Sequence, residues 1–133
     1  MPTPHESARS TTVYIVDDDA MVVRALARFL RSAGHTVETF DSAEAFLKRA
    51  PAPAGGCLLL DVCMPGMSGP ELQLALLERG TQLELFFMSA LDDLRLREQV
   101  LAAGARSWFS KPIDGELLLR AFSGDRPTQR SAG

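Results

Sequence analysis

The stretch Cys57-Leu-Leu-Leu-Asp61-Val-Cys-Met-Pro65-Gly66-Met-Ser-Gly69 places one carboxylate at the end of a continuous apolar run. Apolar residues without alternation are typical of a strand buried on both faces, as in a parallel sheet that helices cover. Pro65, Gly66 and Gly69 then indicate a turn, so Asp61 should lie where the strand ends. Sites in open α/β sheets collect at the carboxyl ends of strands, which makes Asp61 the first candidate for a reactive group.

Strand and helix patterns alternate five times along the chain. This alternation predicts an α/β fold, (βα)5, with a doubly wound five-stranded parallel sheet and right-handed crossovers. β-branched, aromatic and apolar runs predict the strands, and apolar stripes at helical spacing predict the helices. The predicted strands span residues 12–16, 35–40, 57–61, 83–89 and 106–110, and the predicted helices begin near residues 20, 41, 68, 92 and 114.

Two helix starts have recognisable capping residues. Asp41 followed by Glu44 has the form of a capping box, and Ser68 can cap the helix that runs to about residue 78. In that later helix the apolar residues expected on the inner side are Leu72, Leu76 and Leu77.

Length and charge limit the possible functions. The 133 residues predict one domain over 12–123, with a flexible leader at 1–11 and a flexible tail at 124–133. A net charge of -3 gives no electrostatic reason for direct nucleic-acid binding by this chain. The apolar runs are too short to span a membrane and the N-terminus lacks a signal-peptide pattern, so we expect no membrane segment and a cytoplasmic location.

The two cysteines flank Asp61 within one predicted strand and its loop. Cys57 should sit inside the sheet and Cys63 beyond its end, so we expect no disulfide between them. Two cysteines at this spacing, with His5 and His35 far away, match no usual zinc pattern. We therefore expect two free thiols without special chemistry.

Four predicted strands each deliver a polar group at the same end. The groups are the acids Asp17 to Asp19 after the first strand, then Asp61, Ser89 and Lys111 after the third, fourth and fifth. Taken alone, each has an ordinary explanation: aspartates cap helices, serines form turns, and lysines lie in solvent. Because the carboxyl ends of parallel strands share one edge, the set as a whole predicts a single crevice.

The set makes chemical sense together. Several carboxylates in one crevice repel each other and need a cation, and all-oxygen ligation suits Mg²⁺. An aspartate can attack phosphorus and form an acyl phosphate, which makes Asp61 a candidate nucleophile. Lys111 could bind one phosphoryl oxygen, and the Ser89 hydroxyl could donate to another.

The residues also resemble a known family, the receiver domain of two-component response regulators, over about residues 12–122. The phrase from Asp61 to Gly69 resembles the FixJ-type transcriptional regulators in particular. The matching motifs are Val-Tyr-Ile-Val-Asp17-Asp18-Asp19, Leu-Leu-Leu-Asp61-Val-Cys-Met-Pro-Gly-Met-Ser-Gly69, Phe-Met-Ser89-Ala90, Ala-Gly104-Ala105 and Lys111-Pro112, in the family's order and spacing.

The resemblance implies a flavodoxin-like strand order of 2-1-3-4-5 and a role for each acid. Asp61 is expected to be the phosphoacceptor, Asp18 a direct Mg²⁺ ligand, and Asp17 a ligand mainly through water. The backbone carbonyl of Cys63 is expected to complete the protein's metal ligands.

The resemblance also implies roles on the fourth and fifth strands. Ser89 is expected to be the switch hydroxyl, and Lys111 the phosphate-binding lysine, followed by a cis bond to Pro112. Trp108 occupies the aromatic switch position. It is bulkier than the family's usual Tyr or Phe, and the alternative is a partly exposed aromatic packed on the last helix.

The function implied is signalling by phosphorylation rather than enzymatic turnover. A sensor histidine kinase is the expected phosphodonor, and a transcriptional output domain on a longer chain is the expected target. A homodimer is expected through the fourth and fifth helices or the first and fifth, although their surplus apolar residues could instead be explained by packing on the sheet. Those residues are Leu94, Leu96, Val100, Leu101, Leu117, Leu118, Leu119 and Phe122.

Two alternatives remain open at this point. A haloacid-dehalogenase-like phosphatase would use Asp17 as nucleophile in an Asp17-x-Asp19 pair, and also expects a Ser or Thr and a Lys after later strands. Small size and the absence of a cap segment count against it. A binding module that kept the fold but is never phosphorylated is the other alternative, against which the intact acids, hydroxyl and lysine argue.

Overall fold

A computed structural model describes residues 12–49 and 55–123, and within them five parallel strands form one sheet in the order β2-β1-β3-β4-β5. The predicted fold and strand order are confirmed. The leader and tail expected at 1–11 and 124–133 lie outside the described residues. The strands are β1 (Thr12–Val16), β2 (Thr36–Phe40), β3 (Cys57–Asp61), β4 (Glu84–Ser89) and β5 (Ser107–Ser110).

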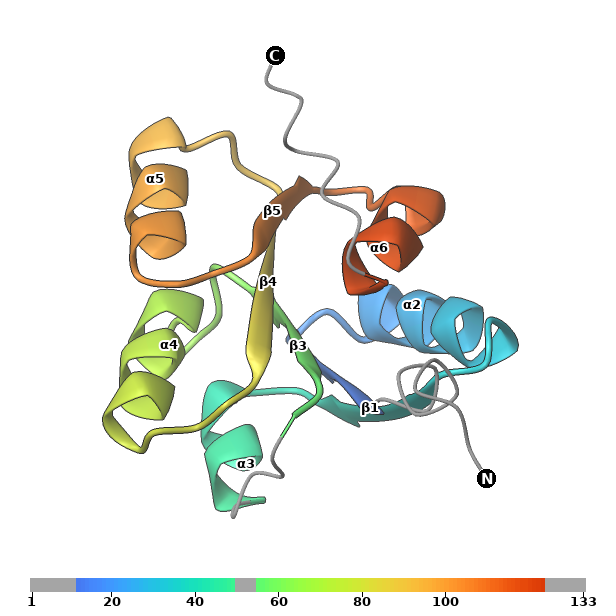
Figure 1. Cartoon of the computed structure of the whole chain (residues 1–133), viewed down its shortest axis with the longest axis horizontal. Coiled ribbons are helices and arrows are strands. Elements are labelled where there is room, and N and C mark those ends of the chain that lie inside the picture. The colour runs from blue at the N-terminus through green and yellow to red at the C-terminus, as the bar shows by residue number, and fades with distance from the viewer. Residues whose placement is uncertain (1–11, 50–54, 124–133) are drawn as a thin grey trace.

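Helices cover both faces of this sheet (Figure 1). One face carries α3 (Ala43–Lys48), α4 (Gly69–Glu78) and α5 (Leu94–Ala102), and the other carries α2 (Ala20–Ser32) and α6 (Gly115–Phe122). Among the described residues, no helix combines the length and apolar character needed to cross a bilayer.

Two apolar clusters, one on each face, hold the layers together. Successive residues of β3 alternate between them: Leu58 and Leu60 belong to the cluster that includes Phe46 and Leu72, and Leu59 to the one that includes Leu30. Every residue of β3 is buried, as the uninterrupted apolar run predicted. The central strand is therefore immobilised from both sides, which fixes the position of the residue at its end.

The helix starts confirm one predicted cap and correct the other. Ser68 caps α4 and forms a capping box with Glu71. The predicted box of Asp41 and Glu44 is wrong, because the N-cap of α3 is Ser42. Its hydroxyl accepts from the Ala45 N–H, which frees the Glu44 carboxylate for another contact.

The inner face of α4 also differs from the prediction. Leu72 and Leu76 are buried as expected, but Leu77 is 53% exposed. Five residues after Leu72, at about 100° per residue, Leu77 lies roughly 140° around the helix from it. Gln73 is buried in its place and donates to the Val100 carbonyl at 3.0 Å, which links α4 to α5.

Gly69 marks a close approach between the start of α4 and the end of β3. Its N–H donates to the Val62 carbonyl at 3.0 Å. A Cβ at this position would collide with the Asp61 backbone carbonyl and lie 3.1 Å from the Phe87 ring. The absence of a side chain therefore lets the helix start directly beneath the strand end.

We expect Gly69→Ala to lower the free energy of unfolding by about 1–3 kcal/mol, because the backbone of the strand end cannot easily move aside. Urea unfolding measures this. Gly80→Ala is the control: its Cβ would meet nothing within 4 Å and its φ is +72°, so it tests backbone strain alone. Wild-type stability of Gly69→Ala would contradict the steric explanation.

The two cysteines are free and differ in exposure, Cys57 being buried and Cys63 exposed. Burial, assisted by the negative charge of Glu84, raises the pKa of the Cys57 thiol to about 12. Because the thiolate is the nucleophile, Cys57 should be inert in the folded protein at pH 8.

We therefore expect iodoacetamide at pH 8 to modify Cys63 and to reach Cys57 only after unfolding in urea. Peptide mapping by mass spectrometry locates the modification. The Cys63→Ser variant is the control and should take up no label while folded. Label on Cys57 in that folded variant would show that β3 is less well protected than its burial indicates.

Candidate functional site

Three carboxylates meet at the carboxyl ends of β1 and β3. Asp17 and Asp18 directly follow β1, and Asp61 is the last residue of β3, the strand paired with β1 in parallel. One oxygen from each acid lies within 4.8 Å of the other two. Asp17 is 1% exposed and Asp61 6%, whereas Asp18 faces solvent. The predicted convergence of these acids is confirmed.

Lys111 reaches the acids from the edge strand β5, two strands away from β3. It follows β5, and its Nζ lies 2.8 Å from Asp17 Oδ2 and 2.9 Å from Asp61 Oδ1. Its backbone N–H donates to the Ser89 carbonyl at 2.9 Å, which fixes the start of the side chain. The bond to Pro112 is cis, as expected. One ammonium group thus bridges two buried carboxylates.

The pKa values reflect burial opposed by this bridge. Burial raises the pKa of the Asp61 carboxyl and the charge of Asp17 adds to it, while the hydrogen bond from Lys111 acts in the opposite direction. For Lys111, burial alone would lower the pKa, but the hydrogen bonds to Asp17 and Asp61 outweigh it and the net pKa is raised. The lysine is therefore charged at neutral pH, and its charge favours the ionised form of Asp61.

The acidic cluster has the donor chemistry of a hard-cation site. Asp17, Asp18 and Asp61 offer only oxygen atoms, and Asp18 opens the cluster to solvent. Hard divalent cations take carboxylate, carbonyl and water oxygens at such sites. Cys63 lies in the loop after β3 with its thiol exposed. The cluster can therefore hold a metal ion.

Ser89 lies at the same edge of the sheet but its hydroxyl is engaged elsewhere. The residue ends β4 and is buried. Its Oγ accepts from the Leu91 N–H at 2.9 Å and donates to the Leu91 carbonyl at 3.0 Å. Within the described residues it makes no hydrogen bond to Asp61. The strand pattern placed this residue, while the direction of its hydroxyl depends on the following turn.

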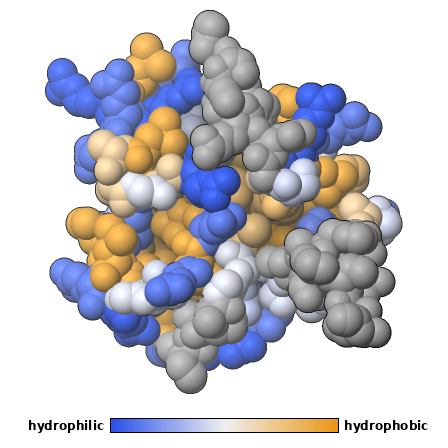
Figure 2. Space-filling view, viewed as in Figure 1, coloured by the Kyte–Doolittle hydropathy of each residue, from blue (hydrophilic) through white to orange (hydrophobic). Residues whose placement is uncertain are grey.

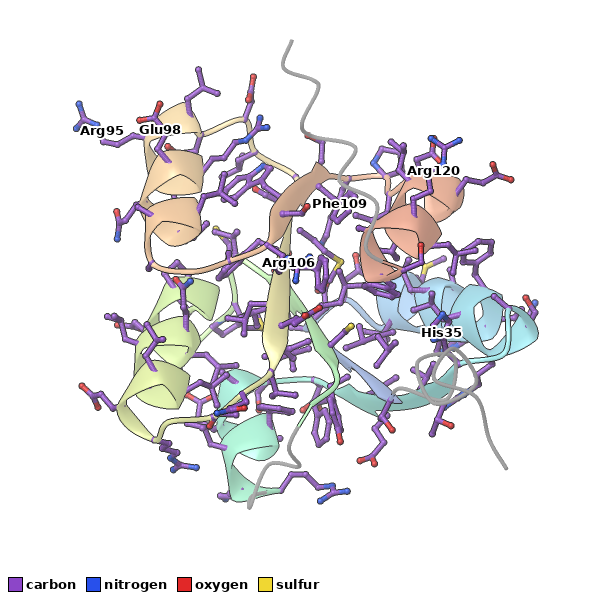
Figure 3. The ribbon with its side chains drawn as sticks, viewed as in Figure 1. His35, Arg95, Glu98, Arg106, Phe109 and Arg120 are labelled. Carbon is purple, nitrogen blue, oxygen red and sulfur yellow. The ribbon has the colours of Figure 1, made fainter. Side chains whose placement is uncertain are left out.

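Trp108 is buried on the opposite face from the one that packing on the last helix would require. It is 8% exposed and belongs to the cluster that includes Val100 of α5, with its ring centroid 6.5 Å from that of Phe87. The neighbouring Phe109 faces α6 instead, in the cluster with Leu118 (Figure 3). The alternative of a partly exposed tryptophan on the last helix is therefore wrong.

One residue beside the loop after β3, Glu44, makes a contact that the sequence pattern does not predict. Glu44, on α3, accepts a hydrogen bond from the Met67 N–H at 2.8 Å, in the loop between β3 and α4. The two residues are 23 positions apart. A local capping pattern suggested a different partner, and nothing in the spacing could have indicated this contact.

Comparison with known proteins agrees with this geometry. The family model of the response regulator receiver domain matches residues 13–123. The response regulator protein TodT of Pseudomonas putida is 42% identical over 130 residues, which cover 96% of this chain and 57% of TodT. The transcriptional regulatory protein FixJ of Azorhizobium caulinodans is 36% identical over 112 residues, 84% of this chain and 53% of FixJ. The chain thus spans about half the length of the curated relatives it matches.

Solved structures of response regulators have a similar fold. The response regulator StyR superposes with a TM-score of 0.81 at 39% identity, covering 92% of this chain and 64% of that one. The crystal structure of FixJ-N superposes with a TM-score of 0.80 at 32% identity, covering 91% of this chain and 95% of that one.

These findings give no support to the phosphatase alternative. In the structure the proposed nucleophile of that alternative, Asp17, is almost fully buried and its oxygens accept from the Asp19 N–H and from Lys111. Three findings support one family assignment. They are the acid cluster bridged by Lys111 on a 2-1-3-4-5 sheet, the family match over nearly all described residues, and relatives above 30% identity. The chain belongs to the response regulator receiver domain family.

Proposed function

We propose that Asp61 accepts a phosphoryl group from the phosphohistidine of a sensor histidine kinase, and that residues 12–123 form the receiver domain that does so. The observation that carries the proposal is the Lys111 ammonium, 2.8 Å from Asp17 and 2.9 Å from Asp61. A cation held this close to the carboxylate is placed to bind a phosphoryl oxygen once one arrives.

The transfer is a displacement at phosphorus. A carboxylate oxygen of Asp61 forms the new P–O bond while the P–N bond to the kinase histidine breaks, and the electron pair of that bond returns to the imidazole. Lys111 stabilises the charge that spreads over the equatorial oxygens. The product is an acyl phosphate on the domain itself, so the chain acts as a phosphoacceptor and is not a turnover enzyme.

The metal we assign to the acidic cluster is Mg²⁺. Asp17, Asp18 and Asp61, with the backbone carbonyl of Cys63, would hold it, because all four offer the oxygen ligands that this ion prefers. A bound Mg²⁺ supplies charge that offsets repulsion between the acids and an incoming phosphoryl donor. Lys111 already supplies one positive charge at this place, and it can move from the carboxylates to the phosphoryl group.

Ser89 and Trp108 are proposed to carry the response. The Ser89 hydroxyl is buried at the same sheet edge as Asp61 and now bonds to Leu91. A phosphoryl oxygen on Asp61 would draw this hydroxyl and the β4–α5 loop inward. Trp108 lies beneath α5, so a change in that loop would alter the packing of its ring.

The proposed readout is a homodimer, with a transcriptional output on a longer chain. Leu94 at the start of α5 is 63% exposed, and Leu117 on α6 is also exposed. The proposed interface pairs α5 with α6, and Figure 2 shows hydrophobic side chains on the surface of α5. Charged Arg95 and Glu98 extend outward on α5 beside them (Figure 3). An apolar patch with a charged rim is typical of an interface. Pairing through α2 and α6 is the alternative arrangement.

We expect incubation with acetyl phosphate and Mg²⁺ to add one phosphoryl group to Asp61, and Asp61→Asn to abolish this, because an amide cannot form the acyl phosphate. Intact mass and peptide mapping measure both outcomes. Circular dichroism of Asp61→Asn should show an intact fold.

Lys111→Met provides a second test of the same site. Loss of its charge should slow labelling of Asp61 by about 10²-fold, the usual cost of removing one electrostatic stabiliser. Label on Asp17 with continuing phosphate release would favour a hydrolase instead. An unlabelled wild type would favour a module that is never phosphorylated.

For the response, we expect phosphorylation to shift the protein from monomer toward dimer and Leu94→Asp to prevent that shift, because a charge would have to be buried in the interface. Light scattering coupled to size-exclusion chromatography measures the mass. Leu77→Asp is the matched control, because it changes another exposed leucine, on α4, outside the proposed α5–α6 surface. Dimerisation that survives Leu94→Asp but not a change on α2 would indicate the α2–α6 arrangement.

A further inference from the structure

The loop between β3 and α4 is firmly attached at its two ends. At its start, the Val62 N–H donates to the Met88 carbonyl of the neighbouring strand at 3.0 Å. At its end, the Gly69 N–H donates to the Val62 carbonyl at 3.0 Å, and Ser68 forms the capping box with Glu71. The residues between these attachments include Cys63, whose carbonyl is assigned above to the metal.

Among the described residues, the middle of the loop has a single hydrogen bond, in addition to the packing of the Met64 and Met67 side chains against the core. Within the described part of the chain, the one hydrogen bond made by residues 63–67 runs from the Met67 N–H to Glu44 Oε2, at 2.8 Å. Glu44 is exposed, in the first turn of α3. This N–H bond is the first cause that holds the pKa of the Glu44 carboxyl below its usual range, with the helix N–H of Glu44 itself adding to it. The acceptor is thus ionised and strong at neutral pH.

The loop has a glycine where this carboxylate approaches it. Gly66, immediately before Met67, has φ +77° and lies directly under the glutamate: a Cβ built there would be 2.7 Å from Glu44 Oε2. The turn by itself explains the positive φ of Gly66. The hydrogen bond from the Met67 N–H explains the position of the Glu44 carboxylate, which fills the space that a side chain at residue 66 would occupy.

We propose that Glu44 is a positioning residue for the metal site, acting through the Met67 N–H to hold the loop that carries the Cys63 carbonyl. This inference rests on the magnesium-dependent function proposed above, and it makes a residue of α3 part of the structure that supports the metal site. A carbonyl on a tethered loop loses less conformational freedom when it binds an ion than one on a free loop. Outer residues that orient ligands in this way typically alter metal affinity about 10–100-fold when they are lost.

The test compares Mg²⁺ affinity by isothermal titration calorimetry in matched variants. Glu44→Ala should weaken binding about tenfold. Glu44→Gln keeps an oxygen acceptor for the Met67 N–H and should stay within about twofold of wild type. Glu38→Ala is the control, since it removes an exposed glutamate whose partner is Arg49 at 3.0 Å rather than the loop, and it should also stay within about twofold.

Hydrogen exchange of the Met67 amide supplies a direct structural readout. Exchange should accelerate about tenfold or more in Glu44→Ala and remain slow in Glu44→Gln and Glu38→Ala, because only the first removes the acceptor. Thermal melts of each variant separate these effects from general instability. A purely stabilising role for Glu44 would lower the melting temperature and leave the affinity of the folded protein unchanged.

Gly66→Ala keeps the test decisive if Glu44→Ala folds poorly, because it displaces the carboxylate without removing Glu44. Its Cβ displaces the carboxylate and its φ of +77° strains the loop, so Gly66→Ala should weaken Mg²⁺ binding by itself. Where Glu44→Ala folds, adding it to Gly66→Ala should change affinity less than about twofold further. Wild-type affinity in Glu44→Ala, equal losses in Glu44→Gln and Glu44→Ala, or additive losses in the double variant would each overturn the inference. A wild type that binds no Mg²⁺ would instead refute the proposed function, and the inference with it.

Discussion

A single ammonium group makes the acidic end of this sheet possible. Two carboxylates, Asp17 and Asp61, are almost fully buried and lie close enough to share one lysine. Burying either charge without a partner would be costly, and burying both side by side would add their repulsion. Lys111 offsets part of both costs with one charge, and it does so from β5, two strands away from β3. Its long flexible stem lets the charge reach across the sheet edge and also lets it move when another anion arrives.

The architecture supplies the rigid part of this arrangement and leaves the loops to do the rest. β3 is packed on both faces, so Asp61 cannot shift without disturbing two cores. Gly69 brings the next helix into contact with the strand end, which leaves the backbone of Asp61 little freedom. By contrast, the side chains that would respond to a phosphoryl group, those of Ser89 and Lys111, stand at the junction of strand and loop. A fixed acceptor surrounded by movable donors is a sound arrangement for a switch.

The sequence predicts the fold and the convergence of the acids because both follow from local patterns that do not depend on tertiary contacts. An unbroken apolar run indicates a central strand, and parallel strands place their last residues at one edge. The errors concern residues whose contacts depend on tertiary structure. Leu77 looked internal but lies off the packed stripe, and Glu44 looked like a local cap but contacts a loop 23 residues away. The burial of Trp108 beneath α5 belongs to the same class, and the direction of the Ser89 hydroxyl, for which the sequence offered no prediction, also depends on tertiary contacts.

The bonds of Ser89 bear on how strongly phosphorylation can act. In the proposed mechanism its hydroxyl must give up two hydrogen bonds to Leu91, at 2.9 and 3.0 Å, to reach a phosphoryl oxygen. Neutral bonds of this kind contribute about 1 kcal/mol each, and one bond to a charged group about 1.5–3 kcal/mol. The exchange is close to balanced, so the hydroxyl alone cannot lock the active state. The proposed phosphorylation then shifts a population, and a partner that binds the shifted surface must complete the change.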